Sequence, residues 1–234
     1  MRIAVSSSTF RRPLASGEIT QLEWLERCAS VLGVDGVVAD VADFPRTDAE
    51  YVAQLRKIAV DASIVPFGID GGSLFEPDAA AARATALALA TTFGAAVVRA
   101  VLPAPGEVPP ATFAETARVA KAFGREAKIA NVTVVVATAP GTIGEDAAGV
   151  KHLLKDADSA WLRACPSALL ETTAKDRVPA FTATPADRAV DVVARAHRAW
   201  LILDAPDADD PWDRVGRAIA ALRVADAEAR IAER

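Results

Sequence analysis

The sequence predicts a single α/β domain, residues 1–234, of the (β/α)8 or TIM barrel class. Residues 132–136 read Val-Thr-Val-Val-Val, a nearly continuous apolar run that is typical of a parallel strand buried on both faces. Helix-start signals follow most of the strand-like runs. The strand centres recur roughly 27 to 39 residues apart, which indicates repeated βα units. These centres lie near Val5, Val38, Val65, Val98, Val135, Leu162 and Leu201.

Short apolar runs define the expected strands in order. They cover residues 2–5, 37–40, 63–69, 95–101, the run from 132 that Pro140 and Gly141 stop, 160–164 and 199–203. The helices between them begin with the spacing of a capping box, in which a threonine precedes a glutamate by three residues. These pairs are Thr20 with Glu23, Thr47 with Glu50, Thr112 with Glu115, and Thr142 with Glu145.

The remaining helices have other start and stop signals. Residues 77–93 form an alanine-rich helix that Gly94 ends. Thr184 and Pro185 supply an N-cap and a proline at the first helical position, and Pro211 opens the last helix.

The repeat is irregular only at residues 165–184, where a shortened seventh unit is expected. A strand at 178–182 would complete it with almost no helix before it. A doubly wound open sheet is the alternative fold. The first strand is not followed by a glycine-rich phosphate fingerprint, which favours the barrel.

Composition indicates a protein of the cytoplasm. The chain has 52% hydrophobic residues, and its apolar runs are shorter than the roughly 18 residues of a membrane helix. Its start lacks the pattern of a signal peptide. A net charge of −5 and a pI near 5.2 argue against nucleic acid as a partner. Two cysteines give neither a disulfide framework nor a zinc pattern, and the Ala, Arg, Asp and Val content suggests a bacterial source.

Charged residues at the expected strand ends are the candidates for chemistry. Arg99 and Arg163 could clamp a phosphate or carboxylate, or could pair with Asp40 or Asp204 in the barrel mouth. Asp40 could be a general base or a turn residue. Asp70 precedes Gly71-Gly72 and is interpreted as a turn residue.

Small polar residues and a thiol also fall at strand ends. Ser6, Ser7 and Ser8 could bind an oxyanion of a substrate or simply cap the first strand. Cys165 lacks a histidine at a strand end that could activate it, so it is interpreted as a packing residue, as is Cys28.

Several stretches resemble the sugar phosphate isomerase/epimerase family, the xylose isomerase-like TIM barrels. Residues 1–8 resemble the opening strand of that family. Residues 20–40, with a Glu-Trp-Leu helix and the turn Leu-Gly-Val-Asp-Gly-Val-Val, are the closest match. Phe44-Pro45, the helix at 51–59, and the ending Leu-Ile-Leu-Asp at 201–204 with Asp-Pro-Trp at 210–212 continue the resemblance.

The resemblance implies a divalent ion (Mn, Mg, Co or Zn) at the barrel mouth. Its ligands would be a Glu on strand five, an Asp on strand six, a His on strand seven and a Glu on strand eight. Here these positions fall on Ala137, near Ser167, on Phe181-Thr182 and on Asp204. Both histidines, His152 and His197, fall inside expected helices. One carboxylate in four positions cannot make the metal site of that family, so we predict no metal cofactor.

The sequence therefore predicts an isomerase/epimerase-like barrel that acts on or binds a small sugar, polyol or related polar metabolite without a divalent ion. Asp40 and Asp204 are the expected proton-transfer residues. Arg99, Arg163, Ser6 and Ser167 are the expected substrate-binding residues. The alternative is a non-catalytic barrel, a pseudoenzyme that serves as a ligand-binding or structural subunit and possibly as a homodimer.

Overall fold

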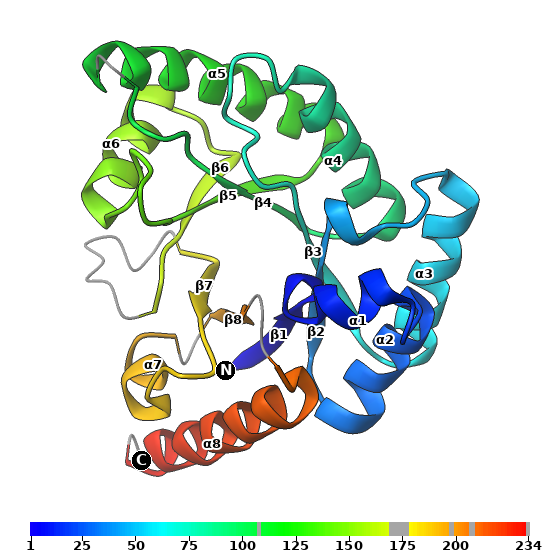
Figure 1. Cartoon of the computed structure of the whole chain (residues 1–234). Coiled ribbons are helices and arrows are strands. Elements are labelled where there is room, and N and C mark those ends of the chain that lie inside the picture. Colours follow the sequence, from blue (N-terminus) through cyan, green and yellow to red (C-terminus); the bar gives the residue numbers. More distant parts are fainter. Residues whose placement is uncertain (107–108, 169–177, 197–198, 206–208, 233–234) are drawn as a thin grey trace.

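Eight parallel strands form one sheet that curls into a barrel, which confirms the predicted fold class (Figure 1). The computed structural model describes residues 1–106, 109–168, 178–196, 199–205 and 209–232. The strand order is β6-β5-β4-β3-β2-β1-β8-β7. The strands are β1 (Arg2–Ser6), β2 (Gly36–Asp40), β3 (Val65–Asp70), β4 (Val97–Val101), β5 (Thr133–Ala137), β6 (Leu162–Cys165), β7 (Ala180–Ala183) and β8 (Trp200–Leu203).

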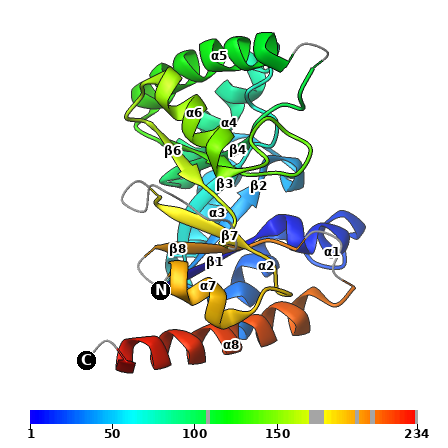
Figure 2. The same ribbon diagram turned by 90° about the vertical axis from the view of Figure 1, so that its left-hand side faces the viewer.

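Helices cover the outside of the barrel. In Figure 2, α5 and α6 lie at one end of the view and α8 at the other, with the strands between them. The α-helices are α1 (Arg11–Ser16), α2 (Gln21–Arg27), α3 (Ala49–Asp61), α4 (Ala80–Phe93), α5 (Pro109–Ala130), α6 (Ala147–Ala157), α7 (Ala189–Ala196) and α8 (Pro211–Ala232). Short helical turns η1 (Ser7–Phe10), η2 (Cys28–Leu32) and η3 (Val41–Asp43) complete the described elements. None of the described helices has the length and apolar character needed to cross a bilayer.

The barrel is weakly closed between β6 and β7. A single bridge joins Ser167 to Thr182 there. The N–H of Ala168 donates to the carbonyl of Thr182 at 2.7 Å, and the N–H of Thr182 donates to the carbonyl of Pro166 at 3.0 Å. The described part of the 165–184 unit contains β7, at 180–183 rather than 178–182, and no helix. This agrees with the predicted irregular unit, although residues 169–177 lie outside the described part.

The interior of the barrel is a small apolar cluster to which every strand contributes one residue. Its members are Ala4, Val38, Phe67, Val97, Val135, Cys165, Ala180 and Ile202. The rings of Phe67 and Trp200 stack inside it with centroids 4.3 Å apart. Because this layer is dry and filled, polar side chains on the same faces are confined to the carboxyl ends of the strands.

The predicted helix starts are only partly correct. The capping box at Thr20 is confirmed: its Oγ1 accepts the N–H of Glu23 at 3.2 Å, and Glu23 accepts the N–H of Thr20 at 2.7 Å. The prediction for Thr47 is wrong, because the N-cap of α3 is Asp48, which accepts the N–H of Tyr51 at 3.0 Å. A carboxylate directly after a threonine is an equally good cap.

Gly94 does end α4 and Pro211 does begin α8, as predicted, but three further N-cap predictions are wrong. The N-cap of α6 is Asp146, because Thr142 and Glu145 fold back on the preceding turn: Thr142 donates to the carbonyl of Ala139. Thr112 lies inside α5, which begins at Pro109. The helix expected from Thr184 begins only at Ala189, after a turn closed through Asp187.

Gly36 tests how tightly the barrel is packed. A Cβ at this position would lie 2.8 Å from the carbonyl oxygen of Val65 and 2.9 Å from Cζ3 of Trp200. We therefore expect Gly36→Ala to lower the free energy of unfolding by roughly 1–3 kcal/mol, measured by urea denaturation.

The matched control is Gly216→Ala, where the new Cβ would meet only Cδ2 of Leu32, at 3.8 Å. Gly216 lies inside α8, so this change should raise stability by about 0.5–1 kcal/mol. Equal stability of the two variants would contradict the packing.

Candidate ligand-binding site at the barrel mouth

The register of the sheet brings charged residues together at the carboxyl ends of the strands. Asp40 on β2 is paired with Asp70 on β3, and Asp70 is paired with Arg99 on β4. Register partners in a parallel sheet face the same way. Val38 and Val97, two residues earlier on β2 and β4, belong to the interior cluster. Asp40 and Arg99 therefore lie on the barrel-facing side, one layer above the dry core.

Arg99 is the centre of this polar layer. Its Nε donates to Oδ2 of Asp70 at 2.8 Å, and its Nη2 donates to both Asp70 and Asp204. The side chain is 9% exposed. Burial alone would lower the pKa of Arg99, but the carboxylates of Asp70 and Asp204 raise this pKa above its usual value. Arg99 therefore stays charged, as a buried cation shared by two carboxylates.

Asp204 follows β8 and uses both of its oxygens inside the protein. Oδ2 pairs with Arg99, and Oδ1 accepts the hydroxyl of Ser8 at 2.5 Å. The hydroxyls of Ser8 and Ser6 are 2.8 Å apart, and Ser6 is fully buried. Of the two partners expected for Arg99, Asp204 is confirmed, whereas Asp40 pairs with Arg11. Ser6 takes part through Ser8, below the surface of the mouth.

Asp40 belongs to a second, more exposed network. Its Oδ2 pairs with Arg11 of α1, whose Nε also donates to Asp43 at 3.1 Å. Ser7 donates to Asp43 at 2.6 Å and accepts the N–H of Asp40 at 2.8 Å. Burial and the charges of Asp70 and Asp43 raise the pKa of Asp40 above its usual value, although the N–H of Ala42 and Arg11 oppose this change. Asp40 therefore holds a proton more readily than an ordinary aspartate does.

Two predicted substrate-binding residues lie apart from these networks. Arg163 is half-buried, donates to the carbonyl of Leu162 at 3.0 Å, and lines a groove of about 660 Å³ beside α6. No ion pair joins it to a carboxylate within the described part of the chain. Ser167 is half-buried at the β6–β7 bridge, and its N–H donates to Oγ1 of Thr138 at 3.0 Å. The structure does not bring either residue into contact with Arg99.

The sequence does not indicate two members of the site, Arg11 and Asp43, and it indicates only part of the role of Asp70. Arg11 and Asp43 have no signal in the sequence because their partners are 29 to 36 residues away. Ser8 is one of the serines expected at the end of the first strand, but its partner Asp204 is 196 residues away. Asp70 does have the predicted turn role, since its Oδ1 accepts the N–H of Gly72 at 3.1 Å. Its other oxygen binds Arg99, which the turn signal does not indicate.

The residues present do not fit the divalent ion that the resemblance implies. Ala137 ends β5 with a methyl group, and Thr182 on β7 provides a hydroxyl in place of an imidazole. Asp204 already has a cationic partner. Within the described residues, no group of three or more His, Cys, Asp or Glu side chains is arranged to hold a metal. The cation at the centre of this mouth is the guanidinium of Arg99.

The remaining reactive groups in the described residues are inert or remote. Cys165 is buried in the barrel interior, and burial raises the pKa of its thiol to about 12. This supports the interpretation of Cys165 as a packing residue. Burial also raises the pKa of Cys28. His152 lies on α6 beside Asp156, while His197 lies outside the described residues.

The fold is that of the xylose isomerase-like (β/α)8 barrels, as solved structures with little sequence identity show. The chain is similar to a probable 3-DHS dehydratase involved in petrobactin synthesis from Bacillus anthracis, with a TM-score of 0.76, 13% identity, and coverage of 95% of this chain and 99% of that one. It is similar to a D-psicose 3-epimerase solved in the presence of D-fructose, with a TM-score of 0.72, 13% identity, and 99% of both chains covered.

A third similar structure is a sugar phosphate isomerase/epimerase from Parabacteroides distasonis, with a TM-score of 0.68, 10% identity, and coverage of 96% of this chain and 94% of that one. No protein-family model and no curated protein sequence matches the chain. At these identities the likeness shows the fold, and the fold alone does not define a reaction.

Arg99→Gln tests the buried ion pairs. The change leaves the carboxylates of Asp70 and Asp204 without their cation, and breaking a buried pair in this way typically costs about 3–5 kcal/mol. We expect a loss of that size in urea denaturation. Replacing both aspartates with asparagine in the same variant should recover part of it.

The matched control is Arg12→Gln, whose side chain is 80% exposed and 3.9 Å from Asp209. It should change stability by less than about 0.5 kcal/mol. An Arg99→Gln effect no larger than the control would show that the network is not structural.

Asp40→Asn tests the raised pKa. When the folded pKa lies above the unfolded value of 3.8, the native state binds the proton more tightly. The free energy of unfolding then falls as pH rises through this window and stays lower above it. Asp40→Asn removes the ionisable group and with it this loss of stability. The stability of the variant relative to the wild type should therefore increase from pH 4 upward and then level off.

Asp48→Asn is the control of opposite sign. Its hydrogen bonds from Arg46 and from the N–H of Tyr51 lower the pKa of Asp48, so this variant should lose stability relative to the wild type as pH rises. Thermal unfolding of the three proteins between pH 3 and pH 8 makes the comparison. Parallel curves for Asp40→Asn and the wild type would refute the raised pKa.

Proposed function

We propose that the chain binds a small neutral polyhydroxylated metabolite, a sugar or a polyol, at the mouth of the barrel without a divalent ion. The observation that carries this proposal is the arrangement of Arg99. Its Nε and Nη2 are held by Asp70 and Asp204, while Nη1 donates to no acceptor among the described residues. A fixed guanidinium with donor capacity left over is suited to bind a carbonyl or hydroxyl oxygen of a ligand.

The charge of the mouth favours a neutral ligand over an anionic one. The two networks contain four carboxylates (Asp40, Asp43, Asp70 and Asp204) and two guanidinium groups (Arg11 and Arg99). An anionic ligand next to Arg99 would therefore meet a net negative environment. A polyol instead offers hydroxyl groups that can donate to carboxylates and accept from arginine. The same charge balance gives less support to the prediction that Arg99 clamps a phosphate.

The second candidate function is isomerase or epimerase chemistry on the same ligand, with Asp40 as the proton-transfer group. Burial and neighbouring charges raise the pKa of Asp40, and such a carboxyl group is better matched to proton transfer near neutral pH. Asp204, the other predicted proton-transfer residue, supports this function less because both of its oxygens are engaged. The similar structures include proteins with epimerase activity in their names, which makes this reaction class the first to test.

The binding experiment uses saturation-transfer NMR with a panel of neutral pentoses, hexoses and polyols and their phosphate esters, with and without EDTA. We expect a neutral member to bind, binding to be unchanged by EDTA, and Arg99→Lys to weaken it at least ten-fold. Lysine keeps the charge but loses the planar fork and its free donor. The control is Arg46→Gln. Arg46 forms an ion pair with Asp48 on the surface, and this variant should bind like the wild type.

Three results would overturn the binding proposal: binding that EDTA abolishes and Mn²⁺ restores, binding of phosphate esters alone, or no binding at all. The second candidate has its own readout. Deuterium exchange from solvent D₂O into a bound sugar, lost in Asp40→Asn, would support proton transfer. Binding without exchange would leave a non-catalytic barrel.

A further inference from the structure

The groove that Arg163 lines runs between α6 and β6, which lie side by side in Figure 1. Its volume of about 660 Å³ is within the range of small-molecule sites. The two ion-pair networks of the mouth contribute none of its described lining residues. Helices normally cover the outer face of each barrel strand, but the described residues contain no helix between β6 and β7. Within the described part, the shortened unit therefore leaves this side of α6 and β6 open.

The walls of this groove are mainly apolar. Val150 and Leu154 are one helical turn apart on α6, so they share one face of that helix. Ala164 and Pro166 contribute from β6 and the residue after it, and Val178 completes the apolar lining. Val150, Pro166 and Val178 are buried, while Leu154 and Ala164 are half-buried. Such walls are suited to the hydrocarbon part of a ligand.

The hydroxyl groups of the lining are already used by the protein. Oγ1 of Thr138 accepts the N–H of Ser167 at 3.0 Å, and Oγ of Ser159 accepts the N–H of Trp161 at 3.3 Å. The groove therefore offers a polyhydroxylated ligand few partners, in contrast to the mouth.

Arg163 is a cation in this groove that lacks an anionic partner. Its Nη1 donates to the carbonyl of Leu162 at 3.0 Å, and no carboxylate of the described residues forms an ion pair with it. A guanidinium has five N–H donors, so most of the donor capacity of Arg163 is unused within the described part. Its side chain is half-buried and has lost part of its hydration. An anionic group in the groove would compensate for that loss.

The other charged side chains of the lining are two lysines and one aspartate. Lys151 and Lys155 are exposed and lie one turn apart on α6, and Asp158 is exposed directly after that helix. Asp158 has no ion pair with Lys155 or Arg163. Lys155 lies in the last turn of α6, where it already compensates the helix dipole. Cations outnumber carboxylates, but the specific attraction for an anion rests on Arg163.

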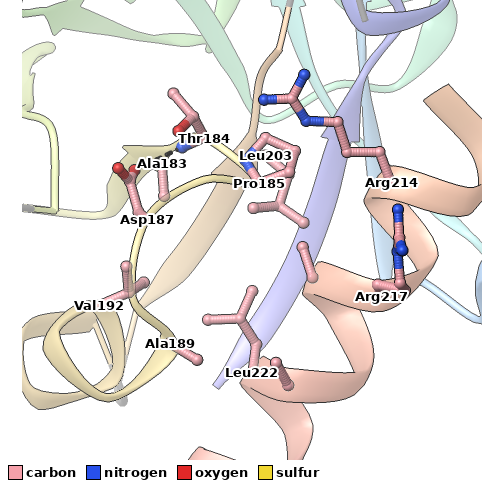
Figure 3. A pocket seen from close by; sticks show the side chains of 12 residues that line it. Ala183, Thr184, Pro185, Asp187, Ala189, Val192, Leu203, Arg214, Arg217 and Leu222 are labelled. Atoms are coloured by element: carbon pink, nitrogen blue, oxygen red, sulfur yellow. Dashed lines mark hydrogen bonds between the residues drawn. The ribbon is translucent and has the colours of Figure 1, made fainter. Parts of the chain in front are cut away.

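A smaller cavity of about 300 Å³, between the β7–α7 connection and α8, lacks this combination (Figure 3). Figure 3 shows its two arginines, Arg214 and Arg217, extending from α8 to the same side. Both are exposed, and Arg217 pairs with Asp213 at 2.8 Å. Water and Asp213 already stabilise these charges, so this cavity provides a control for the location of binding.

We propose that the groove between α6 and β6 is a second ligand site, which binds an amphipathic monocarboxylate, a carboxylic acid with an aliphatic chain. Arg163 would hold the carboxylate through charge-assisted hydrogen bonds from its planar guanidinium. Val150, Leu154 and the other apolar residues of the walls would contact the chain. The proposal does not depend on the function of the mouth, because the two sites share no described residue.

The test is isothermal titration of the whole chain with octanoate, 1-octanol and acetate, at fixed ionic strength and below the concentration at which octanoate forms micelles. We expect saturable one-to-one binding of octanoate. The binding of 1-octanol should be at least ten-fold weaker, because a hydrogen bond between two charged groups is lost. Acetate should show no saturable binding, since it has almost no apolar surface to bury.

Two variants test the location. Arg163→Gln should weaken binding of octanoate at least ten-fold and leave binding of 1-octanol unchanged, because only octanoate has a charge. Ala164→Phe places a ring in the groove and should weaken binding of both probes. The matched control is Arg214→Gln, which removes an arginine from the smaller cavity and should bind octanoate like the wild type. Circular dichroism confirms that each variant is folded.

Several outcomes would overturn the proposal. Equal affinity for octanoate and 1-octanol would show that the groove does not recognise a carboxylate. Equal weakening in Arg163→Gln and Arg214→Gln would show that binding is not located at Arg163. Octanoate binding that Ala164→Phe leaves unchanged, or the absence of saturable octanoate binding, would contradict the groove as the site.

Discussion

The ion pairs of Arg99 with Asp70 and Asp204 constrain the whole mouth of the barrel. They join β3 and β4 to the end of β8. Arg99 and Asp204 are 105 positions apart in the sequence. Ser8 extends the network to the residues after β1 through Asp204. Among the described residues one bridge joins β6 to β7, whereas these side chains connect strands on the opposite, well-paired side of the sheet. The register of the strands fixes them in place, and any ligand at the mouth meets a preformed polar surface.

Carboxylates outnumber arginines at the mouth of the barrel. Asp40, Asp43, Asp70 and Asp204 lie there with two guanidinium groups, those of Arg11 and Arg99. Because electrostatic energy depends on the local surroundings, this local excess of carboxylates affects a ligand at the mouth more than the net charge of −5 for the whole chain.

The sequence predicts the barrel well because its signals are local. The valine run at 132–136 and the regular spacing of strand centres need only hydrophobic periodicity, and β5 lies there. Capping boxes are less specific: Thr20 has one, but at Thr47 the neighbouring Asp48 caps the helix instead. The position of Asp204 could be predicted from its strand end. The second carboxylate on Arg99 could not be predicted, because the glycines that follow Asp70 indicate only a turn. Arg163 has the strand-end spacing of a mouth residue, yet it lies in the groove beside α6. Side-chain pairing across the barrel depends on register, which one sequence does not encode locally.

A guanidinium at the centre of the mouth limits the chemistry that the barrel can support. A divalent ion polarises a carbonyl and also lowers the pKa of a bound hydroxyl, while arginine contributes a single delocalised charge and hydrogen bonds. Arg99 shares that charge with Asp70 and Asp204, so less of it is available to an oxyanion that forms on a ligand. Proton removal would then depend on a carboxylate alone, and Asp40 has Arg11 as its own partner. These constraints favour selective binding over rapid proton transfer, and any catalysis would require Arg11 to release Asp40 when the ligand enters.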